Sequence, residues 1–145
     1  CVRDAGGLVS MRALADGSQK PYELNITYFD ALKGTIEAGE DGLQVARFIC
    51  SQTIVMALEG VPAFYIHSLL ATHNDHAGVE KTGVNRAINR HRWDYPELRA
   101  LLDDPESLNA QVLAALKDRI AIRTAQPGCR NSAYFDQPDR GRGLV

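Results

Sequence analysis

A strongly apolar helix followed almost at once by an apolar extended segment constrains the fold more than any other feature of this sequence. Apolar residues recur at helical spacing from Asp41 to Leu58, and Gly60 is a suitable terminator. An unbroken apolar run, Pro62–His67, follows after a short connection. Such a run is typical of a parallel strand that is covered on both faces. The sequence therefore predicts a helix at 41–58 and a buried parallel strand at 62–67.

The same helix is expected to bury the face on which its apolar residues recur, with Asp41 as its cap. The residues of this face are Leu43, Ala46, Cys50, Ile54 and Ala57. The face is widened by Phe48, Ile49, Val55, Met56 and Leu58, so we expect burial around much of the helix. A strand of the kind expected at 62–67 needs a neighbour on each side, and no second run of this type occurs in the sequence. We therefore expect an incomplete α/β unit that is a piece of a larger domain.

The residues before this helix predict a β-hairpin. Residues 7–14 are expected to form one strand, Asp16-Gly17 the turn, and residues 21–24 the returning strand. Residues 28–33 are expected to form one or two helical turns.

The residues after the expected strand form a long polar connection and then two helices. The connection, 68–93, is rich in Asn, Asp, His and Arg, and a connection of this length is usually functional. The capping-box pattern D-x-x-E at 94–97 would open a short helix, and the pair D-P at 104–105 would start a longer one. Residues 128–145 show no period and are expected to be a disordered tail.

A helix, a strand, a polar connection and a second helix make one αβα stretch of a (β/α) architecture. Ligands in such folds bind at the loops that follow the carboxyl ends of the strands. This topology places His67 and the connection after it on the expected functional face, whatever the chemistry.

The densest cluster of polar donors in this connection is residues 85–93, N-R-A-I-N-R-H-R-W. The planar fork of arginine suits carboxylates, phosphates and vicinal sugar hydroxyls. Basic residues beside an aromatic side chain also suit nucleic acid. Arginines in a long loop can equally hold that loop in place by binding backbone carbonyls and acidic side chains. Local composition leaves these three interpretations open.

The charge and the apolar runs exclude several classes of partner. Sixteen Lys and Arg against eighteen Asp and Glu give a net charge of −2, so no global attraction to nucleic acid or to an anionic membrane is expected. The longest apolar run, 54–70, is interrupted by Glu59, Gly60 and Pro62, so no membrane span is expected either.

Neither the cysteines nor the histidines predict a cofactor site. The three cysteines are odd in number and widely spaced, which favours reduced thiols in a cytoplasm. His67, His73 and His76 with Asp75 match no usual zinc spacing, and we expect no metal and no other cofactor. No acid/base pair of carboxylates and no phosphate-binding glycine loop is evident, so the bond-making residues of an enzyme would lie outside this sequence.

Four segments carry a family resemblance. They read P-Y-E-L-N-I-T-Y at 21–28, G-V-P-A-F-Y-I-H at 60–67, N-D at 74–75 and N-R-A-I-N-R-H at 85–91. In this order and spacing they resemble the sucrose phosphorylase family, a subgroup of the α-amylase-like retaining glycoside enzymes. The resemblance extends over roughly Gly6–Pro127, whereas residues 128–145 depart from the family's continuation.

The resemblance implies that residues 1–127 are the C-terminal part of a catalytic (β/α)8 TIM barrel, with its helix 7, strand 8 and helix 8. It implies a parent enzyme that breaks an α-glucosidic bond through a covalent glucosyl–enzyme intermediate, which inorganic phosphate attacks to give α-glucose 1-phosphate. The family's three catalytic carboxylates would lie upstream. We therefore expect no catalytic residue in this sequence and no activity from it alone.

The resemblance also assigns binding and supporting residues. Arg86 occupies the position of an arginine that binds the glucosyl unit in the donor subsite. Tyr22 aligns with a tyrosine of a mobile loop on the acceptor and phosphate side, and Glu23 is next to it. Residues expected to support the loops are Asn74, Asp75, Arg90 and His91.

Residue 23 departs from the pattern of typical sucrose phosphorylases, which have Gln where this sequence has Glu23. The segments at 21–23 and 66–70 look more like relatives that phosphorolyse glucosylglycerate. The expected donor is sucrose or a sucrose-like glucoside such as glucosylglycerate. An α-glucosidase or transglucosidase of the same superfamily and a non-catalytic module that binds a polyanion are the alternatives.

Overall fold

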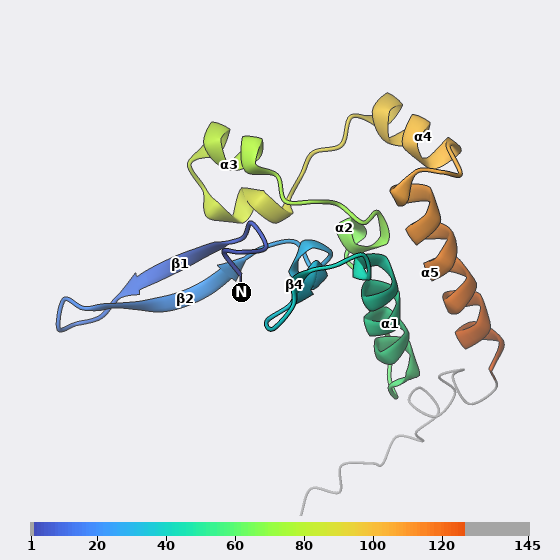
Figure 1. The fold of residues 1–145 in the computed structure, drawn as a ribbon, viewed down its shortest axis with the longest axis horizontal. Coiled ribbons are helices and arrows are strands. Elements are labelled where there is room, and N and C mark those ends of the chain that lie inside the picture. The colour runs from blue at the N-terminus through green and yellow to red at the C-terminus, as the bar shows by residue number, and fades with distance from the viewer. Residues whose placement is uncertain (1, 127–145) are drawn as a thin grey trace, which may run out of the picture.

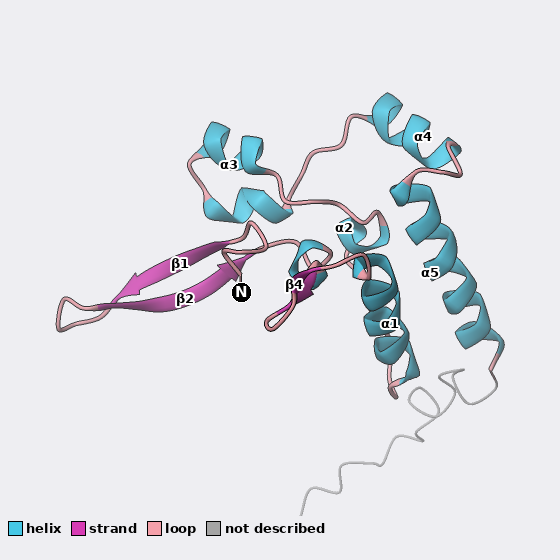
Figure 2. Cartoon of the chain, in the orientation of Figure 1, coloured by secondary structure: helices cyan, strands magenta, loops and turns pink. Residues whose placement is uncertain are grey.

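The computed structural model describes residues 2–126, in which two short hairpins precede a set of helices (Figures 1 and 2). The elements in chain order are β1 (Leu8–Ala13), β2 (Gln19–Asn25), η1 (Asp30–Leu32), β3 (Gly34–Thr35), β4 (Gly39–Glu40), α1 (Gln44–Ala57), α2 (Ile66–Leu69), α3 (His76–Thr82), η2 (Asn85–Asn89), α4 (Tyr95–Asp103) and α5 (Leu108–Ala125). None of the described helices is both long enough and apolar enough to cross a membrane. The disorder predicted for 128–145 falls outside the described residues.

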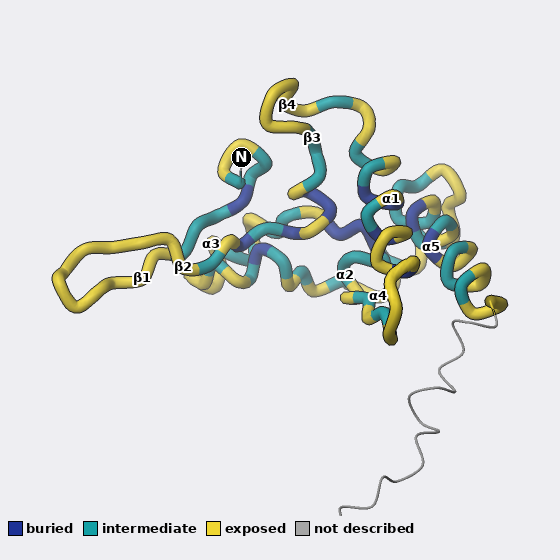
Figure 3. Tube along the Cα trace, turned by 90° about the horizontal axis from the view of Figure 1, so that it is seen from below, coloured by how far each residue is buried: buried dark blue, intermediate teal, exposed yellow. Residues whose placement is uncertain are grey.

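The predicted N-terminal hairpin is confirmed. β1 and β2 pair antiparallel, with Ser10 opposite Glu23 and an irregularity directly after Ser10. The turn contains Gly17, whose φ of 81° lies in the left-handed region that favours glycine. The outer half of the hairpin projects away from the helices and is exposed, whereas its base lies against η2 (Figures 1 and 3).

The core lies where α1, α5 and the segment around η1 meet. Phe29 packs edge-on against Phe48 of α1, with ring centroids 5.2 Å apart, and both side chains are buried. Val112 and Leu116 of α5 and the nearby Ala71 belong to the same buried cluster. Figure 3 shows the buried part of the trace running through this region. Because the cluster draws on residues from 29 to 116, it fixes the middle of the chain relative to its last helix.

The C-terminal end of α1 is held by an arginine of α5. The guanidinium of Arg123 donates to the backbone carbonyls of Met56, Leu58 and Gly60, the last two at 3.1 and 2.6 Å. The last carbonyls of a helix lack intrahelical donors. Arg123 therefore satisfies groups at the end of α1 and joins the two helices.

The helix predicted at 41–58 is present as α1, but it is buried on one side only. Its buried residues are Phe48, Ile49, Gln52 and Met56. Burial is thus confirmed for Phe48, Ile49 and Met56, whereas the five residues at helical spacing that define the predicted face are all exposed, including Cys50, Leu43 at 60% and Ile54 at 58%. Because α1 is apolar around most of its circumference, its periodicity does not select which side is covered, and in the described chain α5 and η1 cover the side of Phe48 and Ile49.

The predicted helix starts are confirmed in one case and wrong in two. Asp94 caps α4 by accepting the backbone N–H of Glu97 at 3.4 Å, as the capping box predicts. α5 begins later than predicted, because its N-cap is Ser107, whose hydroxyl accepts the N–H of Ala110 at 3.1 Å. The proline after Asp104 restricts that residue to extended backbone, so the helix starts after an intervening turn.

Asp41, the predicted cap of α1, lies before the helix, whose N-cap is Leu43. The carboxylate of Asp41 accepts the N–H of Leu43 at 2.9 Å and forms an ion pair with Arg47 at 2.7 Å. The hydrogen bond from Arg47 lowers the pKa of Asp41. The residue orders the approach to α1 instead of capping it.

The buried parallel strand predicted at 62–67 is wrong for the described chain. Residues 61–65 have no regular structure, and the helical turn α2 begins at Ile66. Tyr65 and Ile66 are 52% and 54% exposed. Within residues 2–126 the only strand pairings are β1 with β2 and β3 with β4. An extended segment becomes a strand only by pairing with another strand. Residues 62–65 have no such partner among the described residues and therefore have no regular structure.

Candidate functional site

Arg86 and Glu23, two residues assigned to substrate binding, form an ion pair. The Nε of Arg86 in η2 donates to both carboxylate oxygens of Glu23 in β2, at 2.9 Å each, across 63 positions of sequence. Their side chains are 49% and 32% exposed. The hydrogen bond from Arg86 lowers the pKa of Glu23, and Glu23 raises the pKa of Arg86. Both groups are therefore charged at neutral pH.

The ion pair uses the Nε of Arg86 and leaves its terminal nitrogens to other partners. A guanidinium carries further N–H donors on these nitrogens, in a fixed planar fork. Among residues 2–126 no hydrogen bond to these nitrogens is found. The half-exposed Arg86 can thus hold Glu23 and still present donors to a ligand.

Tyr22 lies next to Glu23 on β2 and is 61% exposed. Its electrostatic interaction contributes to the raised pKa of Arg86, after the larger effect of Glu23. The structure thus places all three residues of the predicted substrate-binding set together, at the base of the hairpin and the start of η2.

A series of side-chain hydrogen bonds supports Glu23 and Arg86. The hydroxyl of Ser10 donates to Asn25 Oδ1 at 2.6 Å and accepts from Asn85 Nδ2 at 3.0 Å. Asn25 is only 1% exposed, and its side chain hydrogen-bonds to Glu23, which contributes to the lowered pKa of that carboxyl. These hydrogen bonds connect β1, β2 and η2 next to the ion pair.

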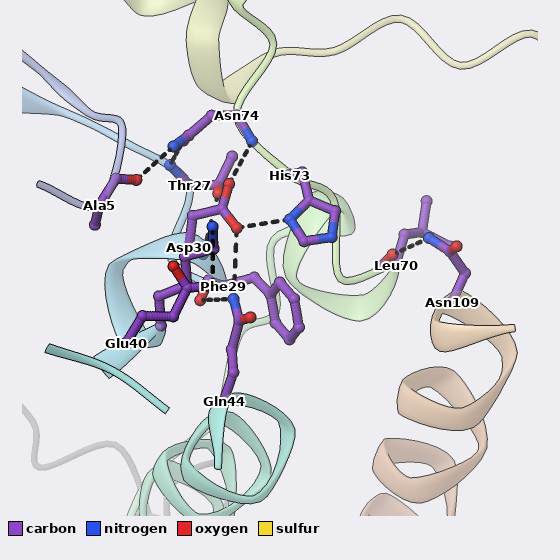
Figure 4. Close-up of polar contacts among 11 residues, drawn as sticks. Ala5, Thr27, Phe29, Asp30, Glu40, Gln44, Leu70, His73, Asn74 and Asn109 are labelled. Carbon is purple, nitrogen blue, oxygen red and sulfur yellow. Dashed lines mark hydrogen bonds and ion pairs between the residues drawn. The ribbon is translucent and has the colours of Figure 1, made fainter. Parts of the chain in front are cut away.

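Asn74, predicted to support the loops, joins three segments of the chain (Figure 4). Its Oδ1 accepts the backbone N–H of Thr27 at 2.8 Å, and its Nδ2 donates to the carbonyl of Ala5 at 3.1 Å. Its own backbone N–H donates to Oδ2 of Asp30 at 2.7 Å. Asn74 therefore holds the N-terminal segment and the exit of β2 against the polar connection.

Asp30 is a buried carboxylate that the sequence reasoning missed. Its side chain is 6% exposed, and its Oδ1 lies 2.6 Å from Nδ1 of His73 and 3.4 Å from Nε2 of Gln44. Burial acts to raise the pKa of Asp30, but the hydrogen bonds from His73, Asn74 and Gln44 outweigh it and lower the pKa. Asp30 in turn raises the pKa of His73. The residue belongs to no chemical motif, so only the fold reveals it.

Asp75 joins the start of α3 to the end of the arginine-rich segment. Its Oδ1 accepts the N–H of Gly78 at 2.7 Å as the cap of α3, and its Oδ2 lies 3.0 Å from Nδ1 of His91. Its backbone N–H donates to the carbonyl of Ile88 at 2.8 Å. His91 also packs edge-on against Trp93, with centroids 4.7 Å apart. These contacts hold the C-terminal half of η2 and the residues that follow it.

Arg90, the fourth residue predicted to support the loops, is exposed. Its charge contributes to the lowered pKa of Glu23, after the larger effects that include Arg86. Within residues 2–126 no hydrogen bond or ion pair of its side chain is found. Its supporting role stays a prediction.

The histidines near the site have protein partners. The hydroxyl of Thr72 lies 3.2 Å from Nδ1 of His67 and accepts the indole N–H of Trp93, also at 3.2 Å. Burial lowers the pKa of His67, and the charge of His91 adds to this effect. Across the described residues, no group of three or more His, Cys, Asp or Glu side chains could hold a metal ion.

A cavity of about 210 Å³ lies between the exit of β2 and the start of the polar connection. Its lining includes Thr27, Tyr28, Tyr65 and His67. The hydroxyl of Tyr65 donates to the carbonyl of Asn89 at 3.1 Å. The structure therefore brings the polar face expected after residue 67 next to the segment that follows Glu23.

No protein-family model matches the chain, but individual proteins do. Glucosylglycerate phosphorylases of Allomeiothermus silvanus and Spirochaeta thermophila are 39% identical over 128 residues and 42% identical over 136 residues, which is 88% and 93% of this chain. A sucrose phosphorylase of Agrobacterium vitis is 30% identical over 120 residues, or 83% of the chain. The chain is a homologue of the glucosylglycerate and sucrose phosphorylases. It spans 23%, 22% and 22% of the lengths of these three relatives.

A solved structure of the phosphorylase family shares the fold. The crystal structure of sucrose 6F-phosphate phosphorylase from Thermoanaerobacter thermosaccharolyticum matches with a TM-score of 0.65 and 24% sequence identity. The match covers 87% of this chain and 24% of the other. At this identity it supports the fold alone, and it fits a partial α/β unit.

Proposed function

We propose that the parent protein is a retaining α-glucoside phosphorylase, which transfers glucose from a sucrose-like α-glucoside to inorganic phosphate and yields α-glucose 1-phosphate. The names and identities of its relatives support this activity. We also propose that residues 1–127 form the C-terminal part of a catalytic (β/α)8 barrel. The three widely spaced cysteines favour a cytoplasmic parent enzyme.

The observation that carries the proposal is the contact between Arg86 and Glu23. Arg86 would bind the glucosyl unit, whereas Tyr22 and Glu23 would shape the acceptor and phosphate side. These assignments concern residues 63 positions apart, and the side chains meet at 2.9 Å. A donor subsite and an acceptor subsite must adjoin at the scissile bond, and a direct contact between their residues supports that arrangement.

In the proposed reaction, this chain's residues bind and orient, while carboxylates outside it make and break bonds. A nucleophilic carboxylate displaces the aglycone from the anomeric carbon, and an acid protonates the departing oxygen. A phosphate oxygen then attacks the anomeric carbon and breaks its bond to the carboxylate, while the residue that acted as the acid takes up the phosphate proton. The two inversions give net retention of configuration. The remaining donors of Arg86 would hold sugar hydroxyls through both steps.

Glucosylglycerate is the donor that the relatives favour. The two glucosylglycerate phosphorylases are 39% and 42% identical to this chain, whereas the sucrose phosphorylase is 30% identical. Glu23, which departs from the Gln of typical sucrose phosphorylases, points in the same direction. We propose glucosylglycerate as the first substrate to test and sucrose as the second.

The test uses the full-length parent enzyme with each glucoside, with and without phosphate. We expect glucose 1-phosphate in the α configuration, formed only when phosphate is present, and more rapidly from glucosylglycerate. Free glucose at a rate independent of phosphate would identify an α-glucosidase, and glucosyl transfer to a sugar would identify a transglucosidase. Either result would overturn the phosphorylase proposal, as would the absence of all turnover.

A further inference from the structure

Asp30 is a buried carboxylate that the proposed chemistry does not use. We propose that Asp30 is a positioning residue, which aligns Glu23 on β2 with Arg86 on η2 by holding Asn74. This inference rests on the proposed function for its kinetic test. The structural path from Asp30 to the ion pair does not depend on the reaction.

Asp30 fixes two consecutive residues of the polar connection. Its Oδ2 accepts the backbone N–H of Asn74 at 2.7 Å, and its Oδ1 binds Nδ1 of His73 at 2.6 Å (Figure 4). The carboxylate is 6% exposed, so solvent offers it few competing donors. One carboxylate therefore holds both the backbone of Asn74 and the side chain of His73.

Asn74 passes this constraint to the strand of Glu23. Its side-chain oxygen accepts the N–H of Thr27 at 2.8 Å. Thr27 is 3% exposed and follows shortly after β2, which ends at Asn25. The position of Asn74 thereby determines where β2 leaves the hairpin.

The next residue passes the same constraint to the segment of Arg86. The N–H of Asp75 donates to the carbonyl of Ile88 in η2 at 2.8 Å, and its carboxylate lies 3.0 Å from His91. Arg86 lies in the same short helix as Ile88. Asn74 and Asp75 together therefore hold the two segments that carry the ion pair, through Thr27 and Ile88.

Asp30 is itself anchored to the core. Gln44 of α1 donates to the carbonyl of Phe29 at 3.0 Å and to Asp30 Oδ1 at 3.4 Å. Phe29 packs edge-on against both Phe48 and His73, at 5.2 Å in each case. A site residue is held accurately when its support is rigid. The buried cluster around Phe29 supplies that support, and Asp30 connects it to His73 and Asn74.

The kinetic test compares Asp30→Asn and Asp30→Ala in the full-length parent with Asp103→Asn as a control. Asp103 also pairs with an arginine, Arg99 at 2.7 Å, but on the exposed helix α4. Misplacing site residues by about 1 Å can cost roughly 100-fold in rate. We expect Asp30→Ala to lower kcat/KM about 10- to 100-fold at temperatures well below its melting point. Asp30→Asn, which keeps an oxygen for the N–H of Asn74, should lose less, and the control should lose less than twofold.

A double-mutant cycle separates positioning from mere stability, because Asp30 does not contact Glu23. If Asp30 aligns the ion pair, Glu23→Gln should change kcat/KM by a smaller factor in the Asp30→Asn background than in the wild type. Multiplicative effects would overturn the proposal. So would an Asp30→Ala variant that melts lower but keeps wild-type kcat/KM. Should Asp30→Ala fail to fold, Asp30→Asn carries both tests.

A third measurement distinguishes failure of this inference from failure of the proposed function. An inactive wild-type parent would refute the phosphorylase activity. The unfolding free energies of Asp30→Asn, Arg86→Met and the double variant would then be compared without any substrate. Non-additive effects would support the positioning role, and additive effects would refute it.

Discussion

The Nε of Arg86 lies 2.9 Å from each carboxylate oxygen of Glu23, although 63 positions of sequence separate the two residues. The pair joins the hairpin to η2. The hydrogen bond between them lowers the pKa of Glu23 and raises the pKa of Arg86, so both side chains are charged at neutral pH. A ligand that binds Arg86 must therefore share it with Glu23. If Arg86 serves the donor subsite as proposed, a change of Arg86 is thus expected to affect the acceptor side as well.

Replacing Arg86 by Lys in the full-length parent is expected to impair turnover severely. Lys keeps the charge but loses the planar fork, so it cannot reproduce the geometry in which Nε holds Glu23 while the terminal nitrogens face a sugar. We expect kcat/KM to fall roughly 10- to 100-fold with every acceptor, because all reactions share the glucosyl unit. Steady-state kinetics and a melting curve would be recorded together. Near-normal turnover at an unchanged melting temperature would remove Arg86 from the donor subsite.

Replacing Glu23 by Gln is expected to alter acceptor preference and to leave glucosyl binding mostly intact. The amide is similar in size but neutral, so it gives up the ion pair with Arg86. The ratio of kcat/KM for sucrose to that for glucosylglycerate should rise relative to the wild type. Glu37→Gln, in the exposed turn between β3 and β4, is the matched control. An unchanged ratio would contradict the assignment of Glu23 to the acceptor side.

The ion pair of His73 and Asp30 predicts a loss of stability as the pH rises. The hydrogen bond to Asp30 raises the pKa of His73 above 6.5, although burial and the charge of Lys33 oppose this effect. The charged form is therefore favoured by folding, so its contribution is complete below the unfolded pKa and is lost as the pH rises through the folded pKa. The melting temperature of the parent, recorded from about pH 6 to 9, should fall as the contribution of charged His73 is lost.

The variant His73→Gln should lack that component of the pH dependence. The exposed neighbour His76 provides a control, because His76→Gln leaves the pair with Asp30 in place. If the melting temperatures of the wild type and of His73→Gln depend on pH equally, the pair of His73 and Asp30 contributes nothing to the pH dependence.

Replacing Arg123 by Met is expected to destabilise the contact between α1 and α5. The guanidinium donates to three carbonyls at the end of α1, those of Met56, Leu58 and Gly60. Two of these hydrogen bonds are exposed, so we expect a loss of about 1–2 kcal/mol in unfolding free energy. Chemical denaturation would measure it, with Lys117→Met on the exposed side of α5 as the control. Equal effects of the two changes would refute the capping role.

Residues 1–145 alone are expected to release no glucose 1-phosphate from glucosylglycerate and phosphate. We expect the catalytic carboxylates implied by the family to lie outside these residues, and binding groups cannot replace a nucleophile. Purified chain would be compared with a heat-treated sample. Turnover above that background would mean that a catalytic residue of this chain has been overlooked.

Features that depend on neighbours in sequence could be predicted. The hairpin follows from two short extended runs around Asp16-Gly17, and the cap of α4 follows from Asp94 and Glu97 three positions later. Each signal is contained within a few residues, so distant parts of the chain cannot change it much. The assignment of α1 as a helix has the same basis.

Features that depend on distant parts of the chain could not be predicted. The buried face of α1 depends on where α5 and η1 lie, and the apolar run at 62–67 depends on strands to pair with. Asp30 acquires its partners His73 and Asn74 only through the fold. Family resemblance brought Glu23 and Arg86 to attention, but it gave no indication that they touch.

The hydrogen bonds around Asn74 limit how this region could be recombined with that of a homologue. They connect it to Asp30, Thr27 and Ala5 across 44, 47 and 69 positions. A crossover placed between α1 and α2 would take Asn74 from one homologue and its three partner segments, at Asp30, Thr27 and Ala5, from the other. The helices of such a chimera could each form, yet the two halves of the site would be mismatched. Segments 5–30 and 73–91 are therefore best exchanged together, as a single module.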